Sequence, residues 1–458
     1  MAHIRLYLAK LVGQSLGIIL RRLPFSGGGA APGLVALKID PNFLRKQAKF
    51  FQLQIIVSGT NGKTTTTRMV SSLLKAHHLP FLHNRTGSNL LRGIASTILA
   101  HLPQLKTNAS LIGLWEVDEA VLPYAIEQLK PQIVVLTNLF RDQLDRYGEI
   151  DTLARKWQQA LQTLPAKATV ILNGDDAGLI ALGQKLTTEV VFYGIDDPKI
   201  GETAPAHAAD ATFCPLCLKP LKYRQVFYSH LGNFSCSCGF KQPAKALTAK
   251  SIATTTYSLS FQVKLNFHSL IMKLPLIGLF NVYNSLAALA IAKALNLNLK
   301  IAQNTLATFH PAFGRMEKIK IKNKIMEMLL VKNPTGFNQI IATLKAKTAL
   351  PLLVIAINDN FADGTDVSWL WDVDFEGLKG DVKRVILTGT RADDIALRLK
   401  YAGWAPPRLW VIPKVATALN QALATKSQPI YVLPTYTAML TTRDILYHWG
   451  VIHASWED

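Results

Sequence analysis

Cysteine is scarce in this sequence of 458 residues, which contains only four. So few cysteines cannot form a disulfide framework, and their placement within 25 positions of one another favours a metal site in a reducing compartment. The N-terminal part also lacks an apolar run long enough to cross a bilayer, because Leu11–Leu20 has ten residues and includes Gln14 and Ser15. No convincing signal-peptide cleavage site follows this run, so we expect a cytoplasmic protein.

Acidic residues are few as well. The chain has 30 Asp and Glu against 50 Lys and Arg, which gives a formal net charge of +20. This balance favours an anionic partner, such as nucleic acid, a membrane surface or an acidic substrate, and does not choose among them. Apolar residues make up 49% of the chain and charged residues 17%, which is typical of a globular protein. The length predicts two or three domains.

The first fifty residues are predicted to form a basic helical segment. Arg5, Lys10, Arg21 and Arg22 flank apolar side chains in this segment. Two interpretations stay open: a helix that lies on an anionic membrane surface, and a basic amphipathic helix that packs on the protein itself. The first would make the protein peripheral at the inner face of the cell membrane.

The strongest signal lies in residues 54–70. An apolar strand is followed by Ser58-Gly-Thr-Asn-Gly-Lys63 and then by Thr64 at the start of a segment with helical apolar spacing. A strand, a glycine-rich turn, a lysine and a threonine at a helix N-terminus together form a phosphate cradle. Lys63 would reach the β- and γ-phosphates, and the Thr64 hydroxyl would hold Mg²⁺. The strict P-loop pattern fails, because Val57 stands where its first glycine should be.

Further apolar strands end in polar residues, at 111–119, 131–138, 169–176 and 189–194. Their alternation with helical stretches predicts a mostly parallel sheet with crossover helices. Acids at the carboxyl end of such a strand lie where ligands bind in open α/β sheets. Glu116 is therefore a candidate Mg²⁺ ligand opposite Thr64. Asp118 and Glu119 are expected to lie around this ligand without binding the ion themselves. The alternative is an ordinary acidic helix N-terminus.

The strand pattern breaks where the four cysteines lie, in a predicted insertion at about residues 210–242. Cys214 and Cys217 form one close pair, and Cys236 and Cys238 form the second after eighteen intervening residues. Two such pairs can close a tetrahedral Zn²⁺ site with no open position, so we expect a structural zinc ribbon. Zinc ribbons also bind nucleic acid, and the positive charge keeps that alternative open.

A second α/β layout begins near residue 318, with apolar strands at 351–357, 382–388, 408–412 and 429–433. Its most informative part is the acidic loop 358–376, which contains two tryptophans. The loop does not fit an EF-hand, because positions three and twelve counted from Asp359 are Phe361 and Leu370. The loop is either a site or interface at a strand end, or a solvated acidic turn.

The form of the phosphate loop, Gly59-Thr-Asn-Gly-Lys-Thr-Thr65, resembles that of the Mur ligases and folylpolyglutamate synthetases. These enzymes use ATP to convert a carboxylate into an acyl phosphate, which an amine then attacks. The resemblance extends to a strand ending in Thr-Asn, to an Asn-x-x-Asn element and to a Gly-Arg-x-Glu element. It assigns the following residues to nucleotide binding: Gly59, Thr60, Asn61, Gly62, Lys63, Thr64, Thr65, Asn138, Asn281 and Arg315.

The same resemblance marks Asp142 and Asp145 as site residues and Asn284 as the second asparagine of its element. Gln143 occupies the position of a histidine that helps bind a second metal in Mur ligases. A neutral amide is a poor ligand for a divalent cation, so the usual two-metal geometry does not follow here.

With the four-cysteine insertion and the motif Asp359-Asn-x-x-Asp-Gly-x-Asp-x-Ser-Trp369, the chain resembles the MurT-type branch of this superfamily. The resemblance implies three parts. These are a basic segment at 1–50, a Mur ligase-like P-loop ATPase domain at 51–315, and a Rossmann-like α/β domain at 316–458.

The implied reaction is amidation of the D-glutamate α-carboxylate of the lipid II stem peptide to D-isoglutamine, in peptidoglycan synthesis. ATP, Mg²⁺ and a structural Zn²⁺ are the implied cofactors. Ammonia would come from a GatD-type glutamine amidotransferase partner in a heterodimer. Asp366 is the implied residue that completes the partner's Cys–His pair, and Lys63 and Glu116 are the implied catalytic residues of the synthetase site.

Two other functions stay open. One is a peptide- or folate-type ligase that adds an amino acid instead of ammonia. The other is a nucleic-acid-binding NTPase that uses the zinc ribbon and the positive charge. The sequence shows no interleaving of aromatic and basic residues of the kind that binds single strands, so no nucleic acid is expected as a partner.

Overall fold

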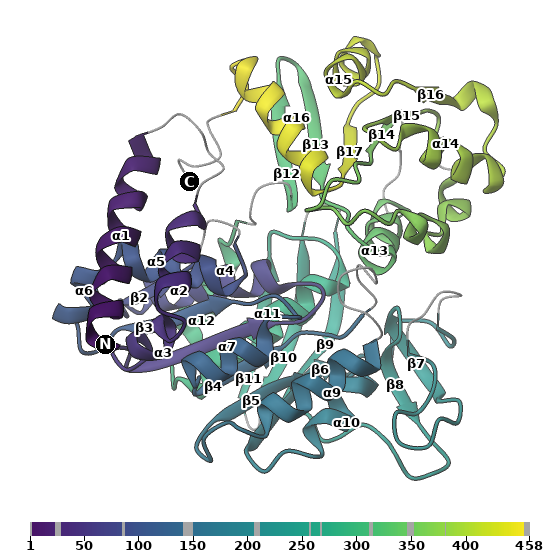
Figure 1. Cartoon of the computed structure of the whole chain (residues 1–458). Helices are drawn as coiled ribbons and strands as arrows, with labels where there is room; N and C mark the ends of the chain where they lie inside the picture. Colours follow the sequence, from purple (N-terminus) through teal and green to yellow (C-terminus); the bar gives the residue numbers. More distant parts are fainter. Residues whose placement is uncertain are drawn as a thin grey trace.

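Two α/β domains make up most of the protein, and a small hairpin extends from the first (Figure 1). The computed structural model describes residues 2–22, 29–84, 88–140, 150–205, 211–255, 258–265, 268–310, 315–345, 352–380 and 382–452. Within these residues the predicted architecture is confirmed: a mostly parallel sheet, an inserted four-cysteine hairpin and a second α/β sheet.

The sheet of the first domain has the strand order β11-β10-β9-β6-β5-β4-β1-β3-β2 in its described residues. From β2 to β9 neighbouring strands are parallel, whereas β10 pairs antiparallel with both β9 and β11. The bounds are β1 (Leu53–Ser58), β2 (Phe81–His83), β3 (Ile112–Glu116), β4 (Ile133–Leu136), β5 (Thr169–Asn173), β6 (Glu189–Ile195), β9 (Leu247–Thr254), β10 (Leu259–Leu265) and β11 (His268–Leu274).

Helices cover both faces of this sheet, which is why its central strands are apolar on both sides. Along β1, Ile55 and Val57 belong to the core under α4 and α11, whereas Ile56 belongs to the core on the opposite face. The helices are α1 (Ala2–Arg22), α2 (Ala31–Ile39), α3 (Phe43–Ala48), α4 (Lys63–Ala76), α5 (Leu91–Ala100), α6 (Leu102–Thr107), α7 (Leu122–Leu129), α9 (Ile150–Leu161), α10 (Ala177–Gly183), α11 (Leu279–Ala294) and α12 (Leu299–Ala307).

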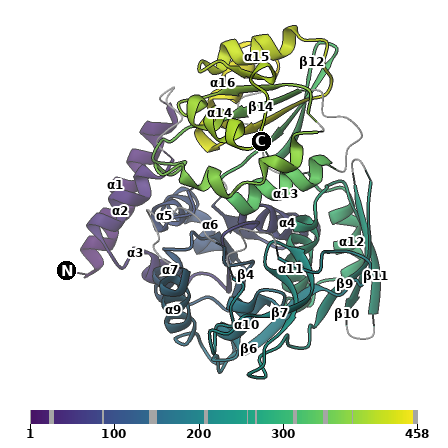
Figure 2. The same cartoon turned by 90° about the vertical axis from the view of Figure 1, so that its right-hand side faces the viewer.

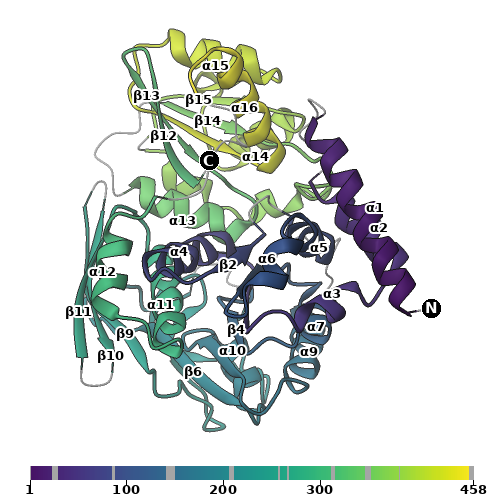
Figure 3. The same ribbon diagram turned by 90° about the vertical axis from the view of Figure 1, so that its left-hand side faces the viewer.

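The first helix lies at the outer edge of the molecule and packs on α2 and α5 (Figure 3). Ala9 is buried in this contact, and Gly13 lies so close to Leu99 that an added Cβ would be 2.7 Å from its side chain. None of the described helices, α1 included, has the length and apolar character needed to cross a membrane.

The hairpin consists of β7 (Lys222–Tyr228) and β8 (Leu231–Ser235), which pair antiparallel. Phe234 and Cys214 pack with Ile180 of α10, so the hairpin has a small apolar core of its own against the first domain.

The sheet of the second domain has the order β12-β13-β17-β14-β15-β16, parallel except for the edge strand β12. Its strands are β12 (Arg315–Ile321), β13 (Lys324–Leu329), β14 (Leu352–Ala356), β15 (Val385–Thr388), β16 (Leu409–Val411) and β17 (Ile430–Pro434). Its helices are α13 (Pro334–Lys345), η2 (Ser368–Asp372), η3 (Phe375–Leu378), α14 (Ala392–Tyr401), η4 (Pro406–Arg408), α15 (Val415–Ala424) and α16 (Tyr436–His448). This domain lies above the first, with α13 at the level between them (Figure 2).

Candidate functional site

The loop between β1 and α4 is shaped by two glycines in the left-handed region of φ. Gly59 has a φ of 125° and Gly62 a φ of 88°, which side chains rarely tolerate. Space forbids a side chain as well: an added Cβ would lie 2.2 Å from Thr137 Oγ1 at Gly59 and 2.1 Å from Asn284 Oδ1 at Gly62. The backbone can therefore curl tightly in front of the α4 N-terminus, where its N–H groups favour an anion.

Lys63 is 6% exposed and folds back onto its own loop. Its ammonium donates to the carbonyls of Gly59 at 2.6 Å and Thr60 at 3.2 Å. It also lies 2.8 Å from Glu119 Oε2, in an ion pair whose two side chains are both buried. A nucleotide phosphate would therefore compete with Glu119 for this lysine.

The hydroxyl of Thr64 donates to Glu116 Oε1 at 2.8 Å, so the structure brings the two candidate Mg²⁺ ligands together. Glu116 is held in turn by Asn84. The Asn84 side chain accepts from the Glu116 N–H at 2.9 Å and donates to the Glu116 carbonyl at 2.9 Å. One hydroxyl and one carboxylate beside a phosphate loop fit Mg²⁺, which takes oxygen ligands and completes its octahedron with phosphates and water.

The end of β4 fixes the other side of the loop. Asn138 accepts from the Asn61 N–H at 2.8 Å and donates to the Asn61 carbonyl at 3.0 Å. The Thr137 hydroxyl donates to that same carbonyl at 2.7 Å, and Thr60 bonds both ways with the Phe140 backbone. These bonds belong to the Thr-Asn strand end that the sequence marked. They fix the loop against the end of β4, where the Thr60 N–H also donates to the Asn138 carbonyl at 3.1 Å.

Asn281 and Asn284 lie one turn apart at the start of α11 and are both buried. The Asn281 amide donates to the Ile277 carbonyl at 2.8 Å and accepts from Asn284 at 3.1 Å. Both residues line a cavity of about 110 Å³ together with Asn61, Gly62, Thr65 and Asn138, and all of these except Asn284 were predicted to bind nucleotide. The structure thus brings five of the predicted nucleotide-binding residues to the wall of one cavity.

The second domain forms the opposite wall of this cavity, and the sequence did not suggest it. Lys332 donates to the Thr60 carbonyl at 2.9 Å, and the Asn333 amide donates to Asn61 Oδ1 at 3.1 Å. Both residues come shortly after β13, past Leu330 and Val331, and precede the Pro334 that starts α13. This is the same strand-end position that singled out Glu116, so a strand followed by Lys-Asn-Pro was the available signal.

Several predicted site residues lie outside the part of the chain that the structure describes. Asp142, Gln143 and Asp145 fall in residues 141–149, outside the described residues. Arg315 begins β12, but its side chain is also outside the described part of the structure. Asn84 is a further residue at the site, and the sequence analysis did not single it out.

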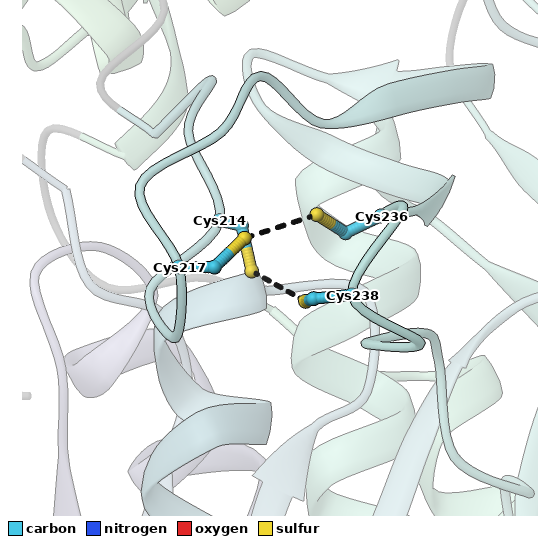
Figure 4. A group of neighbouring side chains, drawn as sticks. All are labelled: Cys214, Cys217, Cys236 and Cys238. Atoms are coloured by element: carbon cyan, nitrogen blue, oxygen red, sulfur yellow. Dashed lines mark hydrogen bonds between the residues drawn. The ribbon is translucent and has the colours of Figure 1, made fainter.

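The four cysteine side chains point toward one another beside the hairpin (Figure 4). All four sulfurs lie within 4.8 Å of one another, with Cys214 and Cys238 3.7 Å apart and Cys217 and Cys236 3.4 Å apart. A tetrahedral zinc site with Zn–S bonds of ~2.3 Å places sulfurs roughly 3.8 Å apart, so the cluster fits this ion. The Cys238 backbone N–H lowers the pKa of the Cys236 thiol to about 6, which favours the thiolate that metals bind.

Asp366 is an exposed residue of the segment between β14 and η2. Its carboxylate accepts from the Ser368 N–H at 2.8 Å and from the Ser368 hydroxyl at 2.9 Å. Phe361 and Trp371, on either side of it in sequence, are both exposed. An oriented, accessible carboxylate in a segment that also exposes aromatic rings is suited to contact with another protein.

Comparison with known proteins covers both domains. Residues 57–214 and 219–292 match the family described as Mur ligase middle domain, and residues 330–439 match the family described as MurT ligase C-terminal.

Two similar proteins are each named lipid II isoglutaminyl synthase (glutamine-hydrolyzing) subunit MurT. The one from Staphylococcus aureus (strain COL) is 34% identical over 87% of this chain and 87% of its own length. The one from Streptococcus pneumoniae is 33% identical over 97% of each chain. Among solved structures, a pseudomurein peptide ligase type C from Methanothermus fervidus has the same fold. Its TM-score is 0.68 at 22% identity, over 87% of this chain and 79% of that one.

Proposed function

Since the chain belongs to the MurT branch of the Mur ligase family, we propose that it is the synthetase subunit of a lipid II isoglutaminyl synthase. It is then an ATP-dependent carbon–nitrogen ligase of peptidoglycan synthesis. The observation that carries the proposal is the extent of the match, which includes the phosphate loop in the first domain and the Asp366 loop in the second.

The proposed reaction has two steps. An oxygen of the D-glutamate α-carboxylate attacks the γ-phosphorus of ATP, and ADP leaves, which gives an acyl phosphate. Ammonia then attacks the acyl carbon, loses a proton and expels phosphate, which gives D-isoglutamine. In both steps charge develops on phosphate oxygens. Lys332 at the wall of the cavity between the domains, Lys63 in the adjoining loop and the N–H groups at the start of α4 would stabilise it.

Thr64 and Glu116 would hold Mg²⁺ at this site, and the ion would neutralise charge on the nucleotide phosphates. The 2.8 Å contact between their oxygens supports this role. The hydrogen bond from the Glu116 N–H to the Asn84 side chain also supports it, because this bond fixes the backbone of Glu116. Lys63 must leave Glu119 to bind a phosphate. In the absence of nucleotide, the ion pair with Glu119 would hold the lysine side chain beside the loop.

Ammonia is proposed to come from a GatD-type glutamine amidotransferase that docks near Asp366. The Asp366 carboxylate would orient a histidine of the partner and stabilise its charged form. Its exposure and its two hydrogen bonds from Ser368 support this role, because they present an oriented carboxylate at the surface.

The outer face of α1 supports a place at the membrane surface. Its large apolar side chains recur at helical spacing on the side away from α2 and α5, and Ile4, Tyr7 and Ile19 are 63%, 65% and 56% exposed. The helix has no Asp or Glu and carries basic residues, which suits anionic lipid headgroups. The exposed apolar residues are Ile4, Tyr7, Leu8, Leu11, Val12, Ile18 and Ile19.

The four cysteines are proposed to hold a structural Zn²⁺ that stabilises the hairpin. All four positions of a tetrahedron would be filled by protein sulfur, so no position is left for a substrate.

The test is a reconstituted reaction with a lipid II analogue, ATP, glutamine and the glutaminase partner, followed by mass spectrometry. Replacement of one carboxyl hydroxyl by an amino group, dependent on ATP and on either glutamine or ammonium, is the expected result. A gain of one amino-acid residue, with no need for the partner, would instead identify an amino-acid-adding ligase.

A further inference from the structure

A groove of about 680 Å³ lies between the four-cysteine hairpin and the far edge of the first sheet. Its walls come from β7 and β8 on one side and from β9 and β10 on the other. Among the described residues it shares no lining side chain with the cavity beside the phosphate loop. The volume falls within the range of about 300–1,000 Å³ that is typical of small-molecule sites.

The charge of this groove is strongly one-sided. Its lining includes six cationic side chains, Lys222, Arg224, Lys241, Lys245, Lys250 and Lys264, and a single carboxylate, Asp196. Asp196 pairs with Lys250 at 2.8 Å. Within the described part of the chain, no carboxylate lies within ion-pair distance of the other exposed cations, those at positions 222, 224, 241 and 264. Like charges held this close repel one another, so the groove attracts anions.

The floor of the groove is rigid because Asp175 ties three elements together. Its carboxylate accepts from the Ile195 N–H at 2.7 Å, from the Gln242 amide at 2.8 Å and from the Tyr283 hydroxyl at 2.9 Å, and it pairs with Lys245. Burial and the Asp175 charge raise the pKa of Tyr283, so its hydroxyl keeps the proton that it donates. Lys245 and Gln242, which line the groove, are therefore fixed in place.

The remaining lining favours phosphate over nucleobases. Asn233, Ser235 and Thr248 add neutral hydrogen-bonding groups to the cationic ones. The one aromatic ring among the lining residues is Phe234, which is buried and packs against Tyr223 and Phe240. Single-stranded nucleic acids are bound by exposed aromatic rings that stack on bases, and this groove offers no such ring among its described residues.

We propose that this groove is a second phosphate site, separate from the phosphate loop, and that it binds a ligand of the diphosphate class. Cations on both walls can each approach a different phosphate, so two linked phosphates would bridge the hairpin and the sheet. The two phosphates could belong to one soluble diphosphate or to two neighbouring headgroups of an anionic membrane, since either presents phosphate oxygens to both walls. The proposal does not depend on the amidation reaction.

The test uses the full-length, zinc-loaded protein in a Lys63→Ala background, which weakens phosphate binding at the loop. Inorganic pyrophosphate is titrated by calorimetry, and phosphatidylcholine vesicles with and without phosphatidylglycerol are used in flotation. The groove variant is Lys222→Gln/Arg224→Gln/Lys264→Gln. Its matched control is Lys167→Gln/Lys383→Gln/Lys426→Gln, which removes the same charge at three exposed lysines outside the groove. Zinc content and melting temperature are measured for both.

We expect the groove variant to bind pyrophosphate about tenfold more weakly or worse, because it loses three charge-assisted contacts, while the control binds as before. Groove-dependent binding of phosphatidylglycerol vesicles without pyrophosphate binding would support the proposal and identify headgroups as the source. Equal binding by both variants would overturn it, and so would a groove-dependent preference for a single-stranded oligonucleotide over pyrophosphate. If the triple variant loses zinc, Lys264→Gln alone, on β10 and outside the hairpin, decides by the same criteria.

Discussion

Lys63 Nζ lies 2.8 Å from Glu119 Oε2, so the lysine expected to bind phosphate is paired with a carboxylate of its own chain. Both side chains are buried, and breaking such a pair from one side leaves a charge without its partner. The pair therefore links the stability of the first domain to the chemistry of the loop.

Lys63→Ala should abolish ATP-dependent amidation and lower the free energy of unfolding by about 3 kcal/mol, because it leaves Glu119 buried without this partner. Adding Glu119→Gln should restore much of the stability and none of the activity. Amidation assays and thermal melts of the three proteins, with partner binding measured by gel filtration, separate the two effects. Amidation retained by Lys63→Ala would exclude a role of this lysine in binding phosphate.

Lys332→Ala and Asn333→Ala should each raise the KM for ATP, by roughly tenfold, since each removes a contact between the second domain and the phosphate loop. Steady-state kinetics with varied ATP measures this. Lys426→Ala, which changes an exposed lysine of the same domain, is the control and should leave the KM unchanged. If both variants behave like the control, the interdomain contacts do not contribute to nucleotide binding.

Cys236→Ser should reduce bound zinc from one equivalent to a small fraction and destabilise the hairpin, because a four-sulfur site loses a ligand. Metal analysis of the purified protein and limited proteolysis of the hairpin test this. Ser237→Ala, an exposed position between two of the cysteines, should keep the metal. A full zinc content in Cys236→Ser would show that this sulfur is not a ligand.

Asp366→Asn should cut glutamine hydrolysis by the complex about a hundredfold or more while sparing amidation from free ammonium, since a neutral amide cannot stabilise a charged histidine. Asp372→Asn, also exposed and six residues further on, is the matched control. Glutaminase and ammonium-dependent amidation are assayed on the same preparations. Loss of both activities together would place Asp366 in the synthetase site.

Ile4→Gln/Tyr7→Gln/Leu11→Gln should weaken binding to phosphatidylglycerol vesicles, because these exposed side chains would insert among the lipids. Tyr124→Gln/Leu397→Gln changes exposed apolar residues on other helices and should bind vesicles as the unchanged protein does. Co-sedimentation at two salt concentrations measures both the apolar and the electrostatic contribution. Unchanged binding by the α1 variant would rule out this face as the membrane contact.

Much of the first domain was predictable because its signals are local. Neighbouring parallel strands bring their carboxyl ends together, so the ends of β1 and β3 had to place Thr64 near Glu116. The spacing of the two cysteine pairs likewise predicted that the four sulfurs would lie close together. The roles of these residues stay predictions until the variants above are assayed.

The contacts that the sequence did not reveal join segments far apart in the chain. Asn61 and Asn333 are separated by 272 positions, and their contact depends on how the two domains pack against each other. The basic groove has the same origin: Lys222 and Lys264 lie in different sheets, and neither sequence neighbourhood is unusual. No local periodicity encodes such docking.

The contact between Asn61 and Asn333 has a thermodynamic consequence. Because the second domain touches the phosphate loop directly, a nucleotide that alters the loop changes the free energy of the interdomain contact. Such coupling is reciprocal. If a bound nucleotide changes the affinity of the second domain for another ligand by some factor, that ligand changes the affinity for the nucleotide by the same factor. The partner proposed to dock at the Asp366 loop would therefore be an effector of ATP binding as well as the proposed source of ammonia.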